Sequence, residues 1–189
     1  MLTQKQHPHL LNADNTLLVV VDMQDSLLRA IHESERVLQN VCTLIRSAQI
    51  MHLPIFCTTQ NRAKLGDLIP EVKSLLPAIS PPFDKMAFSG YQVEAFVSEA
   101  QRTGRKQVLL CGVEAHICVS QTAHDMTFAG YQVHVSSDAI SSRSEHNWRL
   151  GMDRMRQGGA LLTSTEAALY ELLQQAGTSD FREILKMVK

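Results

Sequence analysis

The chain has 189 residues, a net charge of −1 and a hydrophobic fraction of 44%. This size fits one domain with a substantial core, and the lack of a basic excess argues against nucleic acid or an anionic membrane as a partner. No apolar stretch approaches the roughly 18 residues of a membrane span, and the first fifteen residues lack the apolar core of a signal peptide. With four cysteines that form no C-x-x-C pair, these features predict a cytoplasmic protein with free thiols.

Strand-like and helix-like segments alternate along the chain, which is typical of an α/β protein with a parallel sheet. A loose segment at residues 1–14 is expected to precede the first strand, Thr16–Val21, which is a continuous apolar run. We expect a single domain that spans residues 1–189. The patterns predict further strands at 54–59, 107–111, 131–135 and 160–163, and helices at 33–51, 91–103, 115–129, 145–156, 165–175 and 181–188. Residues 60–82 form a long polar connection, which is either functional or hides a short helix around 71–76.

One reactive side chain, Asp22, comes directly after the first predicted strand. Ligands of a doubly wound sheet bind at the carboxyl ends of its strands. Burial there raises the pKa of a carboxylate unless a cation or a donor compensates, so Asp22 is a candidate proton shuttle. Capping of the following turn is the alternative role.

A second reactive side chain, Cys118, lies in the first turns of the helix after the strand at 107–111. The positive end of a helix dipole favours a thiolate, and free amides at a helix start can stabilise an oxyanion. Cys42, Cys57 and Cys111 fit the alternative of a small buried side chain. Cys118 is therefore the candidate nucleophile.

The third candidate is Lys85, which follows two prolines that hold the chain extended. A lysine near the thiol and the carboxylate would lower the pKa of both groups. From spacing alone, an ordinary surface lysine is the favoured alternative.

The histidines predict no metal site, because none of the eight belongs to an H-E-x-x-H motif or to a closely spaced Cys/His set. No glycine-rich phosphate-binding motif occurs either, so no cofactor is predicted.

The chain resembles the isochorismatase-like (cysteine hydrolase) superfamily in four segments that occur in order: VVVDMQDSLL, CTTQNRAKLGDLIPEV, DKMAFSG and CGVEAHICVSQTAHDMTFAGYQVHVSSDAISSR. The similarity extends from Thr16 to Leu173. It is greatest to the isochorismatase domain-containing hydrolases, through TTQNRAKLG, GVEAHICV and RMRQGGALLTSTE.

The resemblance implies a three-layer, Rossmann-like fold with a six-stranded parallel sheet in which the first and fourth strands are adjacent. It also implies a catalytic triad of Asp22, Lys85 and Cys118. A cis peptide bond is implied between Val113 and Glu114, with the backbone amides of Glu114 and Cys118 forming an oxyanion hole.

Adjacency to these motifs predicts a substrate pocket lined by Gln60, Asn61, Phe88, Tyr91 and His116. Oligomers are common among the relatives, so we expect a dimer or a larger homo-oligomer. Trp148 and the amphipathic tail at 181–188 are candidate interface surface, and packing on their own domain is the alternative.

Two departures from the superfamily narrow the chemistry. Nicotinamidases bind a metal through histidine and aspartate in the loop after the second strand, but residues 58–62 read TTQNR. True isochorismatases lack the cysteine. We therefore expect hydrolysis of an amide or another C–N acyl bond of a small molecule. Isochorismate-type vinyl ether hydrolysis and a non-catalytic binding or redox-sensing module are the alternatives.

Overall fold

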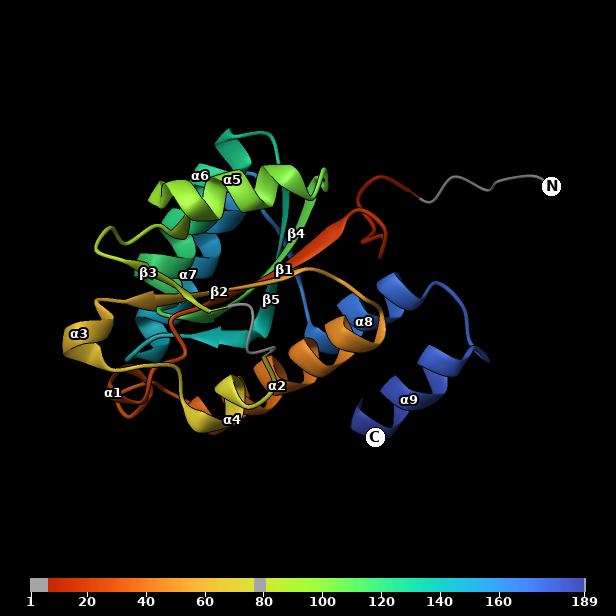
Figure 1. Cartoon of the computed structure of the whole chain (residues 1–189), viewed down its shortest axis with the longest axis horizontal. Helices are drawn as coiled ribbons and strands as arrows, with labels where there is room; N and C mark the ends of the chain where they lie inside the picture. The colour runs from red at the N-terminus through yellow and green to blue at the C-terminus, as the bar shows by residue number, and fades with distance from the viewer. Residues whose placement is uncertain (1–6, 77–80, 189) are drawn as a thin grey trace.

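The structure is a computed structural model that describes residues 7–76 and 81–188, and it contains one six-stranded sheet between two layers of helices (Figure 1). All strand pairs are parallel, and the strand order is β3-β2-β1-β4-β5-β6. The strands are β1 (Thr16–Val21), β2 (Ile55–Gln60), β3 (Phe83–Lys85), β4 (Gln107–Val113), β5 (Gln132–Ser141) and β6 (Leu161–Thr163). The predicted three-layer parallel α/β fold is confirmed.

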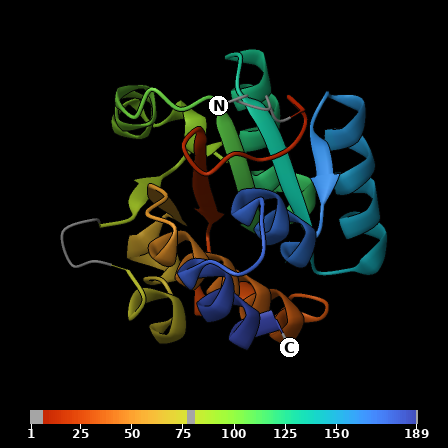
Figure 2. The ribbon, with the colours of Figure 1, turned by 90° about the vertical axis from the view of Figure 1, so that its right-hand side faces the viewer.

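Helices cover both faces of the sheet (Figures 1 and 2). One face carries α5 (Glu94–Arg102), α6 (Ser120–Phe128) and α7 (Glu145–Gln157). The other carries α2 (Ser34–Ile50) and α8 (Thr165–Leu173), and α9 (Ser179–Val188) packs on these two helices. The short elements are α1 (Asp25–Leu28), α3 (Arg62–Leu65), α4 (Pro70–Lys73), the 3₁₀ turn η1 (Gly90–Gln92) and the π-helical turn η2 (Ala115–Val119). No described helix has the length and apolar character that crossing a membrane requires.

The strand β1 shows why the sheet needs both helical layers. Its side chains alternate between the two faces, and each is buried. Leu17 and Val19 pack in the cluster under α5, α6 and α7, whereas Leu18 and Val20 pack in the cluster under α2 and α8. A strand buried on both faces reads as a continuous apolar run, which is the pattern that predicted it.

The fold differs from the sequence-based expectation at β3 and in the segment before β1, among other places. The strand β3 was not predicted, because three residues after a proline pair carry no recognisable alternation. Residues 1–6 of the expected loose segment lie outside the described residues. Leu11, however, is fully buried, and the Asn12 amide donates to the Gln107 side chain at 2.8 Å. These contacts correct the expectation for the later part of that segment.

The strand order reverses between β1 and β4, so the chain leaves these two strands in opposite directions. Their backbones approach closely there because position 112 is glycine. Gly112 has a φ of +111°, and a β carbon on it would overlap the Val21 backbone. The residues that follow β1 and β4 therefore meet at one edge of the sheet.

Candidate active site

Asp22 follows β1 at this edge and is completely buried. Its backbone has a positive φ of 49°, a conformation that non-glycine residues seldom adopt outside constrained sites. Both carboxylate oxygens have partners: Oδ1 accepts a hydrogen bond from Thr58 Oγ1 at 2.7 Å, and Oδ2 accepts one from Lys85 Nζ at 2.7 Å. The carboxylate is thus held in a single orientation.

Lys85 is the last residue of β3 and pairs with Gln60 of β2 in the sheet register. Its side chain and that of Asp22 are fully buried. The ammonium group donates to Asp22 and also to Gln60 Oε1, at 2.6 Å. A buried lysine needs such compensation, since an unpaired buried charge is costly. The surface-lysine alternative is therefore excluded.

Cys118 lies in the π-helical turn η2, and only 7% of the residue is exposed. Its sulfur is 3.9 Å from Gln60 Oε1. Burial first, and then the negative charge of Asp22, raise the pKa of the Cys118 thiol to about 12, although Lys85 acts in the opposite direction. The expectation that the helix start favours a thiolate is therefore corrected: the resting thiol is protonated.

Gln24 fixes the position of Gln60 between the thiol and the lysine. It accepts the Gln60 amide at 2.7 Å and donates to the Gln60 carbonyl at 3.1 Å and to the Gly66 carbonyl at 2.6 Å. Neither Gln24 nor Thr58 was predicted from the sequence. The position of Gln24, two residues after the candidate aspartate, was the available signal in the sequence.

The segment between β4 and Cys118 supplies backbone amides. The Val113–Glu114 peptide bond is cis. The Glu114 carbonyl accepts the amides of Ile117 and Val119, at 3.0 and 3.2 Å, whereas the Glu114 amide has no acceptor within the described residues. A backbone donor with no acceptor is available to a bound group.

Arg143 adds a positive charge near this segment. It follows β5, and its Nε donates to Glu114 Oε2 at 2.9 Å. Arg143 was not predicted from the sequence, although, like Asp22, it follows a strand.

Three predicted pocket residues take distinct positions around β3. Gln60 contacts two of the candidate catalytic residues directly, Lys85 and Cys118. The Asn61 amide donates to the Lys85 carbonyl at 2.9 Å and so helps to hold β3 in place. Phe88 lies on the loop after β3 and is 52% exposed.

The other two predicted pocket residues make contacts elsewhere. The Tyr91 ring packs in an aromatic cluster, 6.3 Å from Phe96 and 5.9 Å from Tyr131. Tyr91 is half-buried, so its role as a pocket residue stays a prediction. His116 Nδ1 contacts Ser142 Oγ at 2.9 Å, on the β5 side of η2.

Within residues 7–76 and 81–188, no three His, Cys, Asp or Glu side chains form a group that could hold a metal ion.

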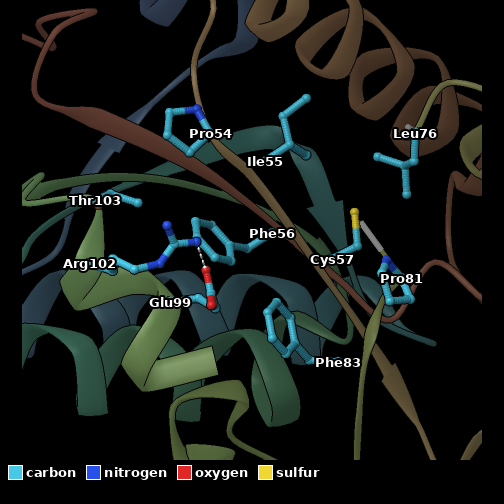
Figure 3. A pocket seen from close by; sticks show the side chains of 10 residues that line it. All are labelled: Pro54, Ile55, Phe56, Cys57, Leu76, Pro81, Phe83, Glu99, Arg102 and Thr103. Carbon is cyan, nitrogen blue, oxygen red and sulfur yellow. Dashed lines mark hydrogen bonds and ion pairs between the residues drawn. The ribbon is translucent and has the colours of Figure 1, made fainter. Parts of the chain in front are cut away.

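A cavity of about 670 Å³ lies at the start of β2, the end of the strand opposite Gln60 (Figure 3). Ile55, Phe56 and Cys57 line it together with Phe83 of β3 and the end of α5. Because β2 runs from this cavity to Gln60, the cavity is separate from the candidate active site. Burial raises the pKa of the Cys57 thiol to about 12, which agrees with its predicted structural role.

Fold and site together define the class: a doubly wound α/β protein with a buried aspartate–lysine pair and a thiol at the switch point of its sheet. The chain belongs to the isochorismatase family, whose domain model, "Isochorismatase domain", matches residues 16–167. Members of this family are hydrolases. The resemblance inferred from the sequence motifs is thereby confirmed.

Curated relatives match most of the chain. The secreted isochorismatase effector Isc1 of Phytophthora sojae is 36% identical over 93% of this chain and 85% of its own length. The isochorismatase domain-containing protein 2 of Danio rerio is 33% identical over 94% of this chain and 89% of its own length.

Solved structures show the same fold. A protein described as MAR1 ribonuclease from Caenorhabditis elegans is 33% identical, with a TM-score of 0.88 over 94% of this chain and 91% of that one. YcaC from Pseudomonas aeruginosa, solved with hexane-2,5-diol and covalent acrylamide, is 25% identical, with a TM-score of 0.89 over 97% and 93%. YcaC from Escherichia coli, an octameric hydrolase of unknown specificity, is 26% identical, with a TM-score of 0.88 over 97% and 92%.

Proposed function

We propose that the protein hydrolyses an amide or another C–N acyl bond of a small molecule, with Cys118 as the nucleophile. The observation that carries this proposal is the convergence of a thiol on a buried aspartate–lysine pair. Lys85 Nζ and Asp22 Oδ2 are 2.7 Å apart, and both side chains are fully buried. The charges of both groups lie close enough to Cys118 to shift the pKa of its thiol.

The raised pKa of Cys118 determines how the first step proceeds. A thiol whose pKa is about 12 is protonated at neutral pH, so the proton leaves as the attack occurs. Asp22 accepts this proton while the sulfur forms a bond to the substrate carbonyl carbon. The C–N bond then breaks, and Asp22 returns the proton to the departing amine.

Hydrolysis of the thioester completes the cycle. Water attacks the acyl carbon, Asp22 accepts one of its protons, and the sulfur leaves and takes that proton back. Lys85 holds the carboxylate in place and balances its charge through both steps. The unpaired Glu114 amide and the Cys118 amide would donate to the oxyanion that forms in each step.

A relative supports a reactive nucleophile in this fold. The Pseudomonas protein is described with covalent acrylamide, an electrophile that thiols attack. In this chain, Cys118 is the thiol beside a candidate base, whereas Cys57 and Cys111 are buried within β2 and β4.

A substrate panel tests the proposal. Small amides, carbamoyl compounds, isochorismate and RNA are assayed with the wild type, Cys118→Ala and the matched control Cys57→Ala. RNA is included because of the description of the nematode relative. We expect turnover of an amide or carbamoyl compound to fall about a thousandfold or more in Cys118→Ala and to persist in Cys57→Ala.

The alternatives predict other outcomes of the same panel. Isochorismate turnover that survives loss of the thiol would favour vinyl ether hydrolysis and reject our mechanism. The redox-sensing alternative is not favoured by the structure, because sensor thiols are exposed and have low pKa values, unlike Cys118.

We also propose that the protein forms a homo-oligomer. The Escherichia coli relative is described as octameric. The suggested contribution of the tail is not supported, since α9 packs on α2 and α8 and buries Ile184. Sedimentation that shows only a monomer would reject an oligomer.

A cytoplasmic location stays a proposal. It rests on the four free cysteines, which suit a reducing compartment. One relative is a secreted effector, so cell fractionation is the appropriate measurement, and recovery in the medium would overturn the proposal.

A further inference from the structure

A second cavity, of about 340 Å³, lies between α6 and α7 on the outer side of the nucleophile turn. This volume is at the lower end of the range of about 300–1,000 Å³ that is typical of small-molecule sites. The lining side chains are all polar, and they come from η2, α6 and α7. They are His116, Ser120, Gln121, His124, Asp125 and Arg154.

Arg154 differs from the other two arginines of α7. Arg149 pairs with Glu145 at 2.5 Å, and Arg156 pairs with Asp153 at 3.2 Å. Within the described parts of the chain, Arg154 has no carboxylate within salt-bridge distance. The one arginine of this helix that lines the cavity is thus the one whose charge is not neutralised.

The cavity contains one carboxylate, and that group already has a donor. Asp125 Oδ2 accepts a hydrogen bond from Gln92 Nε2 at 2.8 Å. The His124 Nδ1 is 2.6 Å from the Ser120 carbonyl, so this nitrogen carries the hydrogen. A carbonyl oxygen can only accept a hydrogen bond, so Nδ1 donates to it, and this bond holds the His124 ring in place.

We propose that this cavity binds a small oxyanion, a phosphate or a carboxylate, through the guanidinium group of Arg154. Guanidinium groups bind both classes with two parallel hydrogen bonds, and the imidazole of His116 can add a further donor. The site is independent of the proposed hydrolysis. His116 nevertheless precedes Cys118 by two residues, so an anion bound in the cavity would contact the turn η2 that carries the nucleophile.

The test is an NMR titration of the ¹⁵N-labelled full chain with inorganic phosphate, and separately with acetate. We expect saturable shifts at the amides of residues 116–125. Arg154→Gln should weaken binding about tenfold, which corresponds to losing one charge-assisted contact. Arg156→Gln removes the same charge two residues away and should leave binding unchanged.

Saturation by phosphate alone, by acetate alone or by both supports the site and assigns its ligand class. No saturable shift with either ion overturns the proposal. Equal weakening in the two arginine variants also overturns it, because the effect would then be one of net charge.

Discussion

Asp22 and Lys85 show how two charges are kept inside this protein. Every charged atom of the pair has a partner: Thr58 and Lys85 bond to the carboxylate, while Asp22 and Gln60 bond to the ammonium group. Removal of one partner of a buried pair typically costs about 3–5 kcal/mol. The same carboxylate opposes ionisation of Cys118, so the residues that would support catalysis also keep the resting thiol neutral.

This opposition predicts an unusual result for Asp22→Asn. Loss of the negative charge should lower the pKa of Cys118, so iodoacetamide should label Cys118 faster at pH 8 than in the wild type. Turnover should fall, because the proton acceptor is gone. Mass spectrometry of the Cys118 peptide measures the labelling, and circular dichroism checks the fold.

Asp84→Asn is the matched control for that experiment. Asp84 lies on β3 next to Lys85, but it bonds to Thr59 and the Arg62 amide rather than to the triad. In Asp84→Asn, iodoacetamide should label Cys118 at the wild-type rate. Unchanged or slower labelling of Cys118 in Asp22→Asn would show that the Asp22 charge does not control the thiol.

Among the helical elements, α7 packs closely against η2. Gly151 lies inside α7, and a β carbon there would be 2.7 Å from the Ala115 carbonyl oxygen and 2.9 Å from the His116 nitrogen. Those atoms belong to the turn that carries Cys118 and the proposed oxyanion donors. The absence of a side chain at Gly151 therefore sets how near the helix lies to the candidate site.

Gly151→Ala should lower turnover about tenfold while the protein stays folded. The clash displaces the turn at a typical cost of about 1–3 kcal/mol, and the better helix propensity of alanine offsets about 1 kcal/mol. Small displacements of a catalytic group are costly for rate. Measurement of kcat and of the urea midpoint separates the two effects.

Gly158→Ala supplies the comparison. Its β carbon would meet the His124 ring, 2.7 Å away, which is a side chain rather than the backbone of the turn. We expect turnover close to that of the wild type. A Gly151→Ala enzyme with full kcat would mean that the turn tolerates the shift.

At the scale of the whole molecule, the two helical layers bury the sheet on both faces. One side chain that this burial removes from water is the titratable His134. His134 of β5 is 2% exposed, and its Nε2 contacts Gln132 at 3.2 Å. Burial, with a smaller contribution from the charge of His9, lowers the pKa of His134 to about 4. The folded state therefore favours the neutral imidazole.

The sign of the resulting pH dependence follows from proton binding. Between about pH 6.5 and 4, the unfolded chain binds a proton that the folded chain does not, so stability falls as the pH is lowered. The loss should approach about 3 kcal/mol for a shift of this size. Urea unfolding at several pH values should show it, and His134→Gln should flatten that part of the profile.

The same unfolding curves test our expectation of a single domain. One transition at each pH agrees with it, and two separated transitions would contradict it. A His134→Gln profile parallel to that of the wild type would assign the pH dependence to other groups.

Much of this protein could be predicted from local sequence patterns. The apolar runs of β1 and β4 and the periodicity of α2 and α7 depend on burial alone, so alternating segments were enough to predict a parallel α/β sheet. The strand ends identified Asp22 and Cys118, and the family motifs added Lys85.

What only the tertiary structure decided depends on contacts between distant segments. The short strand β3 exists because it pairs with β2, and the burial of Lys85 follows from that pairing. The neutral state of Cys118 arises from its burial and then from the charge of Asp22, which lies 96 positions earlier in the chain. Local patterns contain neither the desolvation of a group nor the charge opposite it, and these two quantities set the chemistry of this site.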